Sequence, residues 1–368
     1  MVQLSSVRES NVSLASTTSG QIALFVGATS GIAYHTLTEF ARNSNQPKVY
    51  VVGRGEAKLS KVIGELEGIN PQGSYTSINS EISLLKNVDT ACEELKRKEK
   101  GLDLLVMCPG YLKLSRVGMY FPGNSIAPTK PGKVKDWKDL TPNPADNADG
   151  LEDTISLRYY VRMRFIQNLL PLLTSRPSSR IVSIHGAGRE GRLNENDLEL
   201  KYTYSFLNAS MYTCTMNTLA LAELASSHPS ISCIHVFPGV IITPSFDKFA
   251  EDWYFPLRFL FMQLVLPFAK LFTVSLPECG QRQLFYATSA KYPPAGVRDP
   301  PGGGVALPKG VEVAKGADSK EGSGCYLLNW DGETIGDENL LEEYRKKEMG
   351  KKIWEHTQEV FDRVVGKS

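Results

Sequence analysis

Short runs of apolar residues alternate with amphipathic stretches along the chain from Gln21 onward. Five of these runs are rich in Val, Ile and Leu, the pattern of strands buried on both faces of a parallel sheet. With a weaker sixth run and a late seventh, they predict strands within 22–27, 48–53, 75–82, 102–110, 180–186, 231–239 and 325–330. Helical patterns occupy the intervals, and this alternation predicts an α/β fold. We therefore expect a single domain built on a Rossmann-type, doubly wound parallel sheet.

Changes in composition divide the chain into segments. Residues 1–20 are polar and rich in Ser and Thr, and we expect them to be flexible. The Rossmann-type domain extends over 21–292 and contains a polar, Pro-rich insertion at 112–150. Residues 293–324 are expected to form a mobile Gly- and Pro-rich loop. A C-terminal strand and helix within 325–368 are expected to pack on the domain.

A very apolar segment, 246–275, follows the sixth strand. Arg258, Lys270 and two prolines interrupt its apolar run WYFPLRFLFMQLVLPFAKLF. A membrane-spanning helix needs about 20 uninterrupted apolar residues. We therefore favour a pair of short lid helices over an apolar pocket rather than contact with a membrane, and expect no integral membrane segment.

The charge and cysteine content exclude several kinds of partner. The chain has 368 residues, with 41 basic and 40 acidic side chains and a formal net charge of +1. This balance gives no electrostatic basis for binding nucleic acid. The six cysteines and five histidines are dispersed, so no metal site is predicted. Without an apolar leader at the start, we expect a cytoplasmic protein with reduced thiols.

The segment GATSGIA, residues 27–33, lies between the first strand and the first helix. Glycines there allow a tight turn, and backbone N–H groups at a helix N-terminus can bind a pyrophosphate. A plain turn is the alternative interpretation. The segment predicts a dinucleotide site that includes Gly27, Thr29, Ser30, Gly31 and Ile32.

The second strand ends in VVGRGEAK, which places Arg54 where NAD-binding proteins usually carry an acidic residue. An arginine can pair with the 2′-phosphate that distinguishes NADP(H) from NAD(H). We therefore expect NADP(H) as the cofactor. A solvated surface arginine is the alternative.

An ordered set of motifs connects these features: GATSGIA, LLVMCPG, NLLPLL, RIVSIHG, LALAEL and FPGVIITP. In this order they resemble the short-chain dehydrogenase/reductase superfamily over 21–290, and the tail is similar to that of fungal, retinol-dehydrogenase-like members. The resemblance implies that Gly110 of LLVMCPG belongs to the cofactor site. It also implies a homodimer, paired through the helices that carry LLPLL and LALAEL. The nicotinamide end would be held by the residues that match the family's turn, Pro238, Gly239, Ile241 and Thr243.

The family's catalytic tetrad, which the resemblance implies, is a tyrosine, a lysine, a serine and an asparagine. Counted from the flanking motifs, these positions carry Phe206, Ser210, Gly186 and Arg158. All four differ, and Phe206 has no hydroxyl with which to act as a general acid. Losing a positioned acid costs about 10²–10⁴ in rate, so an ordinary ketone or alcohol would be a poor substrate.

Three polar residues near these positions are the catalytic candidates: His185, Tyr204 and Arg158. His185 ends a strand, where ligands bind in open α/β sheets; a histidine bound to neighbouring backbone is the alternative. Arg158 shares its helix with Arg162 and Arg164, which makes a salt-bridged surface arginine the alternative. The connection before the active-site helix is long, so Tyr204 is either a displaced replacement for the tyrosine or a packing aromatic.

These observations predict an atypical NADP(H)-binding enzyme of secondary metabolism. Its substrate would be a small molecule with a bulky hydrophobic skeleton. Hydride transfer is the cofactor's chemistry, so an iminium or conjugated acceptor would need little proton donation. A non-redox cyclisation or isomerisation in the same pocket is the related hypothesis. A conventional oxidoreductase whose acid has moved to Tyr204, or to the weaker candidates Tyr202 and Tyr212, is the second hypothesis. A cofactor-binding pseudoenzyme is the third.

Overall fold

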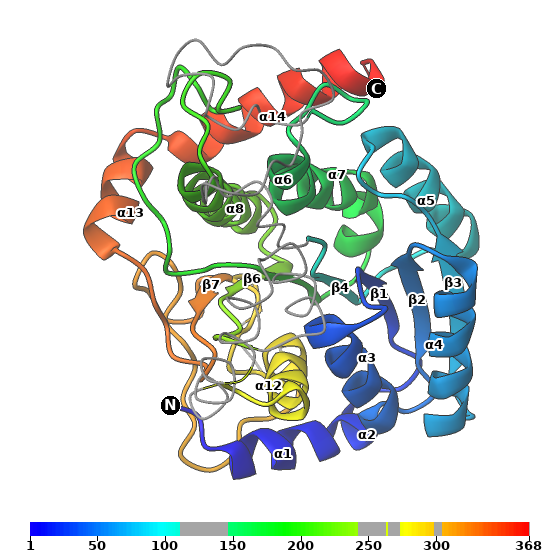
Figure 1. Ribbon diagram of the computed structural model, residues 1–368. Helices are drawn as coiled ribbons and strands as arrows, with labels where there is room; N and C mark the ends of the chain where they lie inside the picture. Colours follow the sequence, from blue (N-terminus) through cyan, green and yellow to red (C-terminus); the bar gives the residue numbers. More distant parts are fainter. Residues whose placement is uncertain (111–145, 242–262, 264–272, 298–303, 368) are drawn as a thin grey trace.

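The computed structural model describes residues 1–110, 146–241, 263, 273–297 and 304–367. Seven parallel strands form one sheet in the order β3-β2-β1-β4-β5-β6-β7 (Figure 1). The strands are β1 (Ile22–Val26), β2 (Lys48–Gly53), β3 (Ser74–Asn79), β4 (Leu104–Met107), β5 (Ser179–Ile184), β6 (Ile231–Val236) and β7 (Cys325–Leu328). The expected Rossmann-type, doubly wound parallel sheet is confirmed.

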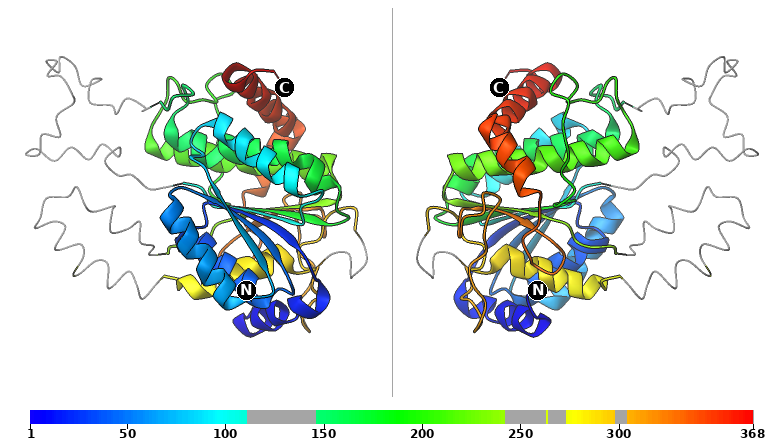
Figure 2. Two further views of the ribbon diagram at one scale, coloured as in Figure 1. Left: turned by 90° about the vertical axis from the view of Figure 1, so that its right-hand side faces the viewer. Right: turned by 90° about the vertical axis from the view of Figure 1, so that its left-hand side faces the viewer.

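Helices cover both faces of this sheet (Figure 2). One face carries α3 (Gly31–Asn43), α4 (Glu56–Ile69) and α12 (Leu276–Thr288). The other face carries α5 (Leu85–Lys98), α7 (Val161–Thr174) and α8 (Phe206–Ser227). The chain enters α7 through the short helix α6 (Asp153–Ile155) and a π-helical turn, η3 (Ser156–Tyr160).

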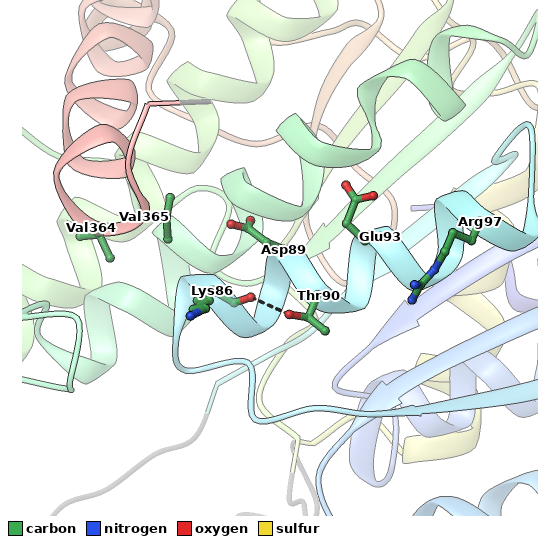
Figure 3. Close-up of a pocket in the computed structure, with 7 residues that line it drawn as sticks. All are labelled: Lys86, Asp89, Thr90, Glu93, Arg97, Val364 and Val365. Atoms are coloured by element: carbon green, nitrogen blue, oxygen red, sulfur yellow. Dashed lines mark hydrogen bonds between the residues drawn. The ribbon is translucent and has the colours of Figure 1, made fainter.

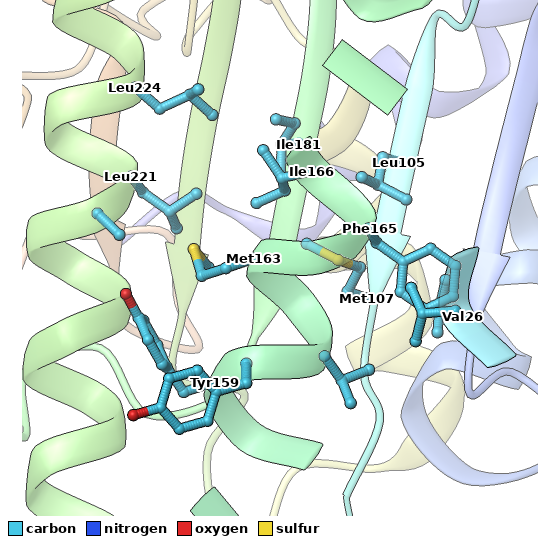
Figure 4. Close-up of a cluster of buried hydrophobic side chains, with 14 of the residues drawn as sticks. Val26, Leu105, Met107, Tyr159, Met163, Phe165, Ile166, Ile181, Leu221 and Leu224 are labelled. Atoms are coloured by element: carbon cyan, nitrogen blue, oxygen red, sulfur yellow. The ribbon is translucent and has the colours of Figure 1, made fainter. Parts of the chain in front are cut away.

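The strand sequences explain why both faces are covered. Successive side chains of a strand point to opposite faces of the sheet. Leu24 therefore joins the core beneath α7 and α8, and Phe25 joins the core beneath α3 and α12. Figure 4 shows part of the first core, where Ile166 of α7 and Leu221 of α8 lie over the strands. Because both faces need apolar side chains, inner strands such as β1 and β4 have continuous apolar sequences, whereas the edge strand β3 does not.

The first twenty residues are ordered, and the expectation of a flexible N-terminus is wrong. They contain α1 (Leu4–Val12), which lies outside α12, and α2 (Leu14–Thr17), which follows it below α3 (Figure 1). Leu14 is buried in the core on that face. The amide Nδ2 of Asn11 donates to the carbonyl oxygen of Gln281 at 2.9 Å. The exposed side chains of these helices account for the polar composition of the segment. A few buried contacts attach the opposite side of the helices to the domain.

The C-terminal segment extends the sheet and adds helices outside α7 and α8. Strand β7 pairs with β6, and α13 (Glu338–Lys346) and α14 (Met349–Val365) follow it. The indole N–H of Trp354 in α14 donates to the carbonyl oxygen of Ala220 in α8 at 2.9 Å. The hydroxyls of Tyr159 and Thr357 lie 2.7 Å apart. Helix α14 therefore lies across α8 and the start of α7 (Figure 2).

This placement affects the implied homodimer. The motifs LLPLL and LALAEL lie in α7 and α8. The guanidinium of Arg164 in α7 lies 5.1 Å from the ring centroid of Phe361 in α14, and Gln167 is hydrogen-bonded to Gln358. A second copy could approach these faces of α7 and α8 only after α14 had moved away.

Several expected segments lie wholly or partly outside the described residues. Residues 112–145 of the insertion, and all of the apolar lid except Gln263 and 273–275, are not described. Residues 304–324 contain no helix or strand, but bridges join Ser289 to Val305 and Lys315 to Glu321. None of the described helices has the length and apolar character needed to cross a membrane.

We predict that Phe361→Ala destabilises the protein by about 3–5 kcal/mol, because it leaves a cavity where a fully buried ring packs between α14 and α7. Urea unfolding would measure this. Lys351→Ala, on the exposed side of the same helix, should change the free energy of unfolding by less than about 0.5 kcal/mol. Equal effects of the two substitutions would show that α14 does not pack on the domain.

Candidate active site

The loop between β1 and α3 has the geometry of a phosphate cradle. Gly27 has φ +77° and Gly31 has φ +67°, in the left-handed region that favours glycine. A Cβ on Gly27 would lie 3.0 Å from the carbonyl oxygen of Cys108, at the end of β4. Ser30 caps α3 with extended backbone and makes no side-chain capping hydrogen bond. The first turn of α3 is therefore suited to bind an anion through its backbone N–H groups, as expected for the loop that also contains Thr29 and Ile32.

Arg54 lies just after β2, beyond the phosphate loop. Its guanidinium is paired with the Glu81 carboxylate at 2.9 Å, and 64% of the Arg54 side chain is exposed. An exposed ion pair of this kind contributes only about 0–1 kcal/mol. Glu81 therefore holds Arg54 in place only weakly, and a phosphate could replace Glu81 as the partner of Arg54.

The turn after β6 forms the other end of the site. Gly239 has φ +88°, and a Cβ there would lie 3.1 Å from the Cβ of Trp330. The Cys279 thiol lies 4.0 Å from the carbonyl oxygen of Pro238, and Ile241 is buried. Thr243, expected at the same end, lies outside the described residues. Trp330 comes from the C-terminal extension, and sequence analysis gave no signal for it.

The four tetrad positions fall on the expected elements. Phe206 is the first residue of α8, and the Ser205 hydroxyl caps the helix by accepting from the N–H of Asn208 at 3.1 Å. Ser210 lies one turn further along. A Cβ on Gly186 would lie 2.5 Å from the Cys214 sulfur. The serine position therefore has no room for a side chain unless Cys214 moves.

Arg158 and Tyr204 are brought together with a carboxylate that sequence analysis missed. The Tyr204 hydroxyl donates to Oε1 of Glu152 at 3.0 Å, and Oε2 of Glu152 accepts from the N–H of Ile155 at 2.9 Å. Glu152 and Arg158 are both buried. Burial lowers the pKa of Arg158, while Cys214, Glu152 and Tyr204 act in the opposite direction. Arg158 is therefore a buried residue and not a surface arginine.

A second buried arginine, Arg162, lies one turn further along the helix. Its Nη1 donates to the carbonyl oxygen of Met107 and to the Ser183 hydroxyl, both at 2.9 Å. Its Nη2 donates to the carbonyl oxygens of Pro109 at 3.0 Å and Ile184 at 3.1 Å. The guanidinium therefore joins the carboxyl ends of β4 and β5. No motif in the sequence distinguishes Arg162 from its neighbours Arg158 and Arg164.

His185 follows β5 and is held in one tautomer. Its Nε2 lies 3.0 Å from the Thr213 hydroxyl, and that hydroxyl donates to the carbonyl oxygen of Ala209 at 2.8 Å. Because a hydroxyl has one proton, Nε2 must be the donor to Thr213, which leaves Nδ1 as an acceptor. The pKa of His185 is lowered well below its usual value by burial, with the charges of Arg162 and Arg158 adding to this. His185 is therefore neutral at pH 7.

His235, in β6, stacks on His185 with ring centroids 6.0 Å apart. Its Nε2 accepts from the N–H of Gly186 at 3.3 Å, so its Nδ1 carries the proton toward the Thr218 hydroxyl at 2.8 Å. That hydroxyl donates to Oε1 of Glu190 at 2.7 Å. This buried chain of hydrogen bonds fixes the loop that follows β5.

One surface pocket among the described residues lies away from these side chains. It has a volume of about 600 Å³ and lies between α5 and the end of α14 (Figure 3). Lys86, Glu93 and Arg97 line it together with Val364 and Val365. None of its lining residues belongs to the phosphate loop or to the strand ends. We therefore place the candidate active site at the carboxyl edge of the sheet.

The family model for short chain dehydrogenases matches residues 21–252. The chain belongs to the short-chain dehydrogenase family. It is 38% identical over 365 residues to oxidoreductase AN1596 of Emericella nidulans, covering 99% of both chains. It is 34% identical to oxidoreductase andH of Emericella variicolor, covering 100% of this chain and 98% of that one. The expectation that this family member is an oxidoreductase is confirmed.

Solved structures of the family share its fold. One is L-sorbose reductase from Gluconobacter frateurii, complexed with NADPH and L-sorbose. The two chains are 16% identical with a TM-score of 0.52, and the match covers 80% of this chain and 97% of the other.

We predict that the protein loses stability as pH falls below about 6.5, the usual pKa of an unfolded histidine. Burial, with Arg162 adding to it, lowers the pKa of His235 to about 3. As pH falls, His235 therefore binds a proton in the unfolded chain before it does so in the folded protein. The free energy of unfolding decreases by roughly 1.4 kcal/mol for each pH unit below about 6.5. Urea unfolding at several pH values should show a flatter pH dependence for His235→Gln. The same slope in both proteins would contradict the prediction.

Proposed function

We propose that this short-chain dehydrogenase binds NADP(H) and acts on a bulky hydrophobic metabolite of secondary metabolism, without the family's tyrosine–lysine pair. The reaction is hydride transfer to a substrate that is already activated, such as an iminium or a conjugated acceptor. The observation that carries the proposal is a retained cofactor cradle beside four replaced tetrad positions.

The residues present fit a nicotinamide dinucleotide. Gly27 and Gly31 have the positive φ angles that the loop needs, and the first turn of α3 offers backbone N–H groups to a pyrophosphate. Arg54 would bind the 2′-phosphate, exchanging its ion pair with Glu81. Gly110, with φ +145°, follows β4 at the carboxyl edge of the sheet and would also belong to the cofactor site. When bound, the cofactor would supply the hydride.

The polar groups of the site are poorly suited to proton transfer at neutral pH. The Tyr204 proton is directed to the Glu152 carboxylate. The lowered pKa of His185 keeps its ring neutral, and its Nε2 proton is directed to the Thr213 hydroxyl. His185 is therefore not a general acid. A substrate that carries its own electrophilic centre does not need such an acid. His185 Nδ1, Tyr204 and Arg158 would then orient the substrate.

Exposed apolar side chains support a hydrophobic ligand. Val240, which follows the Gly239 turn, is 60% exposed, and Leu207, at the start of α8, is 77% exposed. Single exposed apolar side chains are common on protein surfaces, so these two support a hydrophobic ligand only because each is next in sequence to a residue of the candidate site. The same pocket could also hold a substrate for a non-redox cyclisation or isomerisation.

The second candidate is a conventional reductase in which Tyr204 has become the proton donor. It is favoured by one observation, which is that Tyr204 is close enough to Arg158 to affect its pKa. A cation near a phenol favours the phenolate, as the lysine does in the family's tetrad. The Glu152 carboxylate opposes this effect.

We predict that Gly27→Ala weakens NADPH binding more than tenfold. The new Cβ would lie 3.0 Å from the Cys108 carbonyl oxygen at a φ of +77°, which forces the phosphate loop to move. Isothermal titration calorimetry with NADPH would measure the change. Gly64→Ala in α4, where a Cβ would meet nothing within 4 Å, should bind NADPH like the unmodified protein. Absence of NADPH binding by the unmodified protein would overturn the proposed function.

We predict that Tyr204→Phe slows the reduction of 3,4-dihydroisoquinolinium by NADPH less than tenfold, because the iminium needs no proton. NADPH absorbance would follow the reaction. If Tyr204 is instead the proton donor, α-tetralone should be the better substrate, and the substitution should slow its reduction by about 10²–10⁴.

A further inference from the structure

We infer that Trp330 is a positioning residue for the reaction. Its side chain fixes the turn after β6, residues 237–241, and through this turn it fixes the nicotinamide half of the cofactor. Trp330 belongs to the C-terminal extension, in a short loop that follows β7, and its side chain is partly exposed. This inference rests on the proposed cofactor site.

The order of the strands places the turn after β6 on the nicotinamide side of that site. Arg54, the proposed partner of the 2′-phosphate, follows β2. The pyrophosphate would bind at the first turn of α3, which follows β1. From β1 the sheet continues through β4 and β5 to β6. A dinucleotide bound across the carboxyl edge of the sheet therefore has its nicotinamide half on the side of β6.

Helix α12 connects this turn to the phosphate end of the site. Near the start of α12, the Cys279 thiol lies 4.0 Å from the carbonyl oxygen of Pro238. A Cβ on the next residue, Gly280, would lie 2.7 Å from the carbonyl oxygen of His35 in α3. The two helices therefore approach each other closely at this glycine. Because α3 begins at the phosphate loop, α12 sets the separation between that loop and the turn after β6.

The side chain of Trp330 packs directly on the turn. A Cβ on Gly239 would lie 3.1 Å from the Cβ of Trp330 and 3.3 Å from its Cγ. The Arg282 guanidinium of α12 lies over the indole, 5.4 Å from the ring centroid, a favourable cation–π arrangement. The Tyr286 hydroxyl, also from α12, donates to the Trp330 carbonyl oxygen at 2.7 Å. Trp330 therefore joins the Gly239 turn to α12.

The groups that hold Trp330 are themselves fixed. Only 3% of Arg282 is exposed. It donates through Nη1 to the carbonyl oxygen of Val2 at 3.0 Å and through Nε to the Glu278 carboxylate at 2.9 Å. The N–H of Val2 donates to the carbonyl oxygen of Asp331 at 3.1 Å. The N-terminal segment, α12 and the C-terminal extension therefore hold the indole together, and little further ordering is needed when a ligand binds.

Loss of the indole should affect the nicotinamide and leave the phosphates bound. The phosphates would bind at α3 and Arg54, whereas the turn after β6 would become free to move. Ordering that turn again on binding should raise the Kd of NADPH about tenfold in Trp330→Ala. A misplacement of about 1 Å between reacting atoms can slow a reaction about 10²-fold, and we expect hydride transfer to slow by about that factor.

Isothermal titration calorimetry with two ligands tests this inference. One ligand is NADPH, and the other is 2′-phospho-ADP-ribose, which has the same phosphates but no nicotinamide. Trp330→Ala should weaken the binding of NADPH and leave the Kd of 2′-phospho-ADP-ribose unchanged. Trp330→Phe, which keeps the Cγ and an aromatic ring, should restore NADPH binding. Trp354→Phe, which removes a hydrogen bond between α14 and α8, should leave both Kd values unchanged.

The two binding constants decide the inference whatever substrate the enzyme accepts. If Trp330→Ala does not fold, Trp330→Leu takes its place with the same expected pattern. Equal weakening of both ligands would indicate a general structural role, and unchanged NADPH binding would exclude a role in positioning. Either result would overturn the inference and leave the proposed function intact. Failure of the unmodified protein to bind NADPH would instead overturn the proposed function.

Discussion

The Arg162 guanidinium is the contact on which the candidate site depends. It joins the ends of β4 and β5 through three backbone carbonyl oxygens and the Ser183 hydroxyl. Burying a charge without a carboxylate partner is costly, and these four acceptors reduce that cost. Ser183 also donates to Asn217, whose amide donates to the carbonyl oxygen of Arg158. One network therefore fixes two strand ends, the active-site helix and the turn that carries Arg158.

The sheet could be predicted because each strand and the phosphate loop are specified by residues within one short segment of the sequence. Strands such as IALFV are apolar at every position since both faces are covered, and the glycines of the phosphate loop are required by φ angles within the loop itself. The positions of Gly186 and Ser210 also follow from counting along neighbouring motifs.

The site could be predicted only in part, because its remaining contacts join distant parts of the chain. Glu152 meets Tyr204 across 52 positions, and Trp330 reaches Gly239 from the C-terminal extension. Nothing in the sequence around either residue shows its partner. The N-terminal helices were missed for the same reason, since Asn11 binds Gln281 across 270 positions. Polar composition predicts solvent exposure, but it does not reveal a few buried contacts on one side of a helix.

The close approach of Cys214 to Gly186 bears on how this site could have evolved. A serine at 186 would fit only if the Cys214 side chain moved away or a smaller residue stood at 214, because the sulfur occupies the space that the new side chain needs. Each change alone would be harmful, the first by steric overlap and the second by leaving a cavity. Substitutions at 186 and 214 are therefore coupled, and a serine at 186 is tolerated best beside a smaller residue at 214.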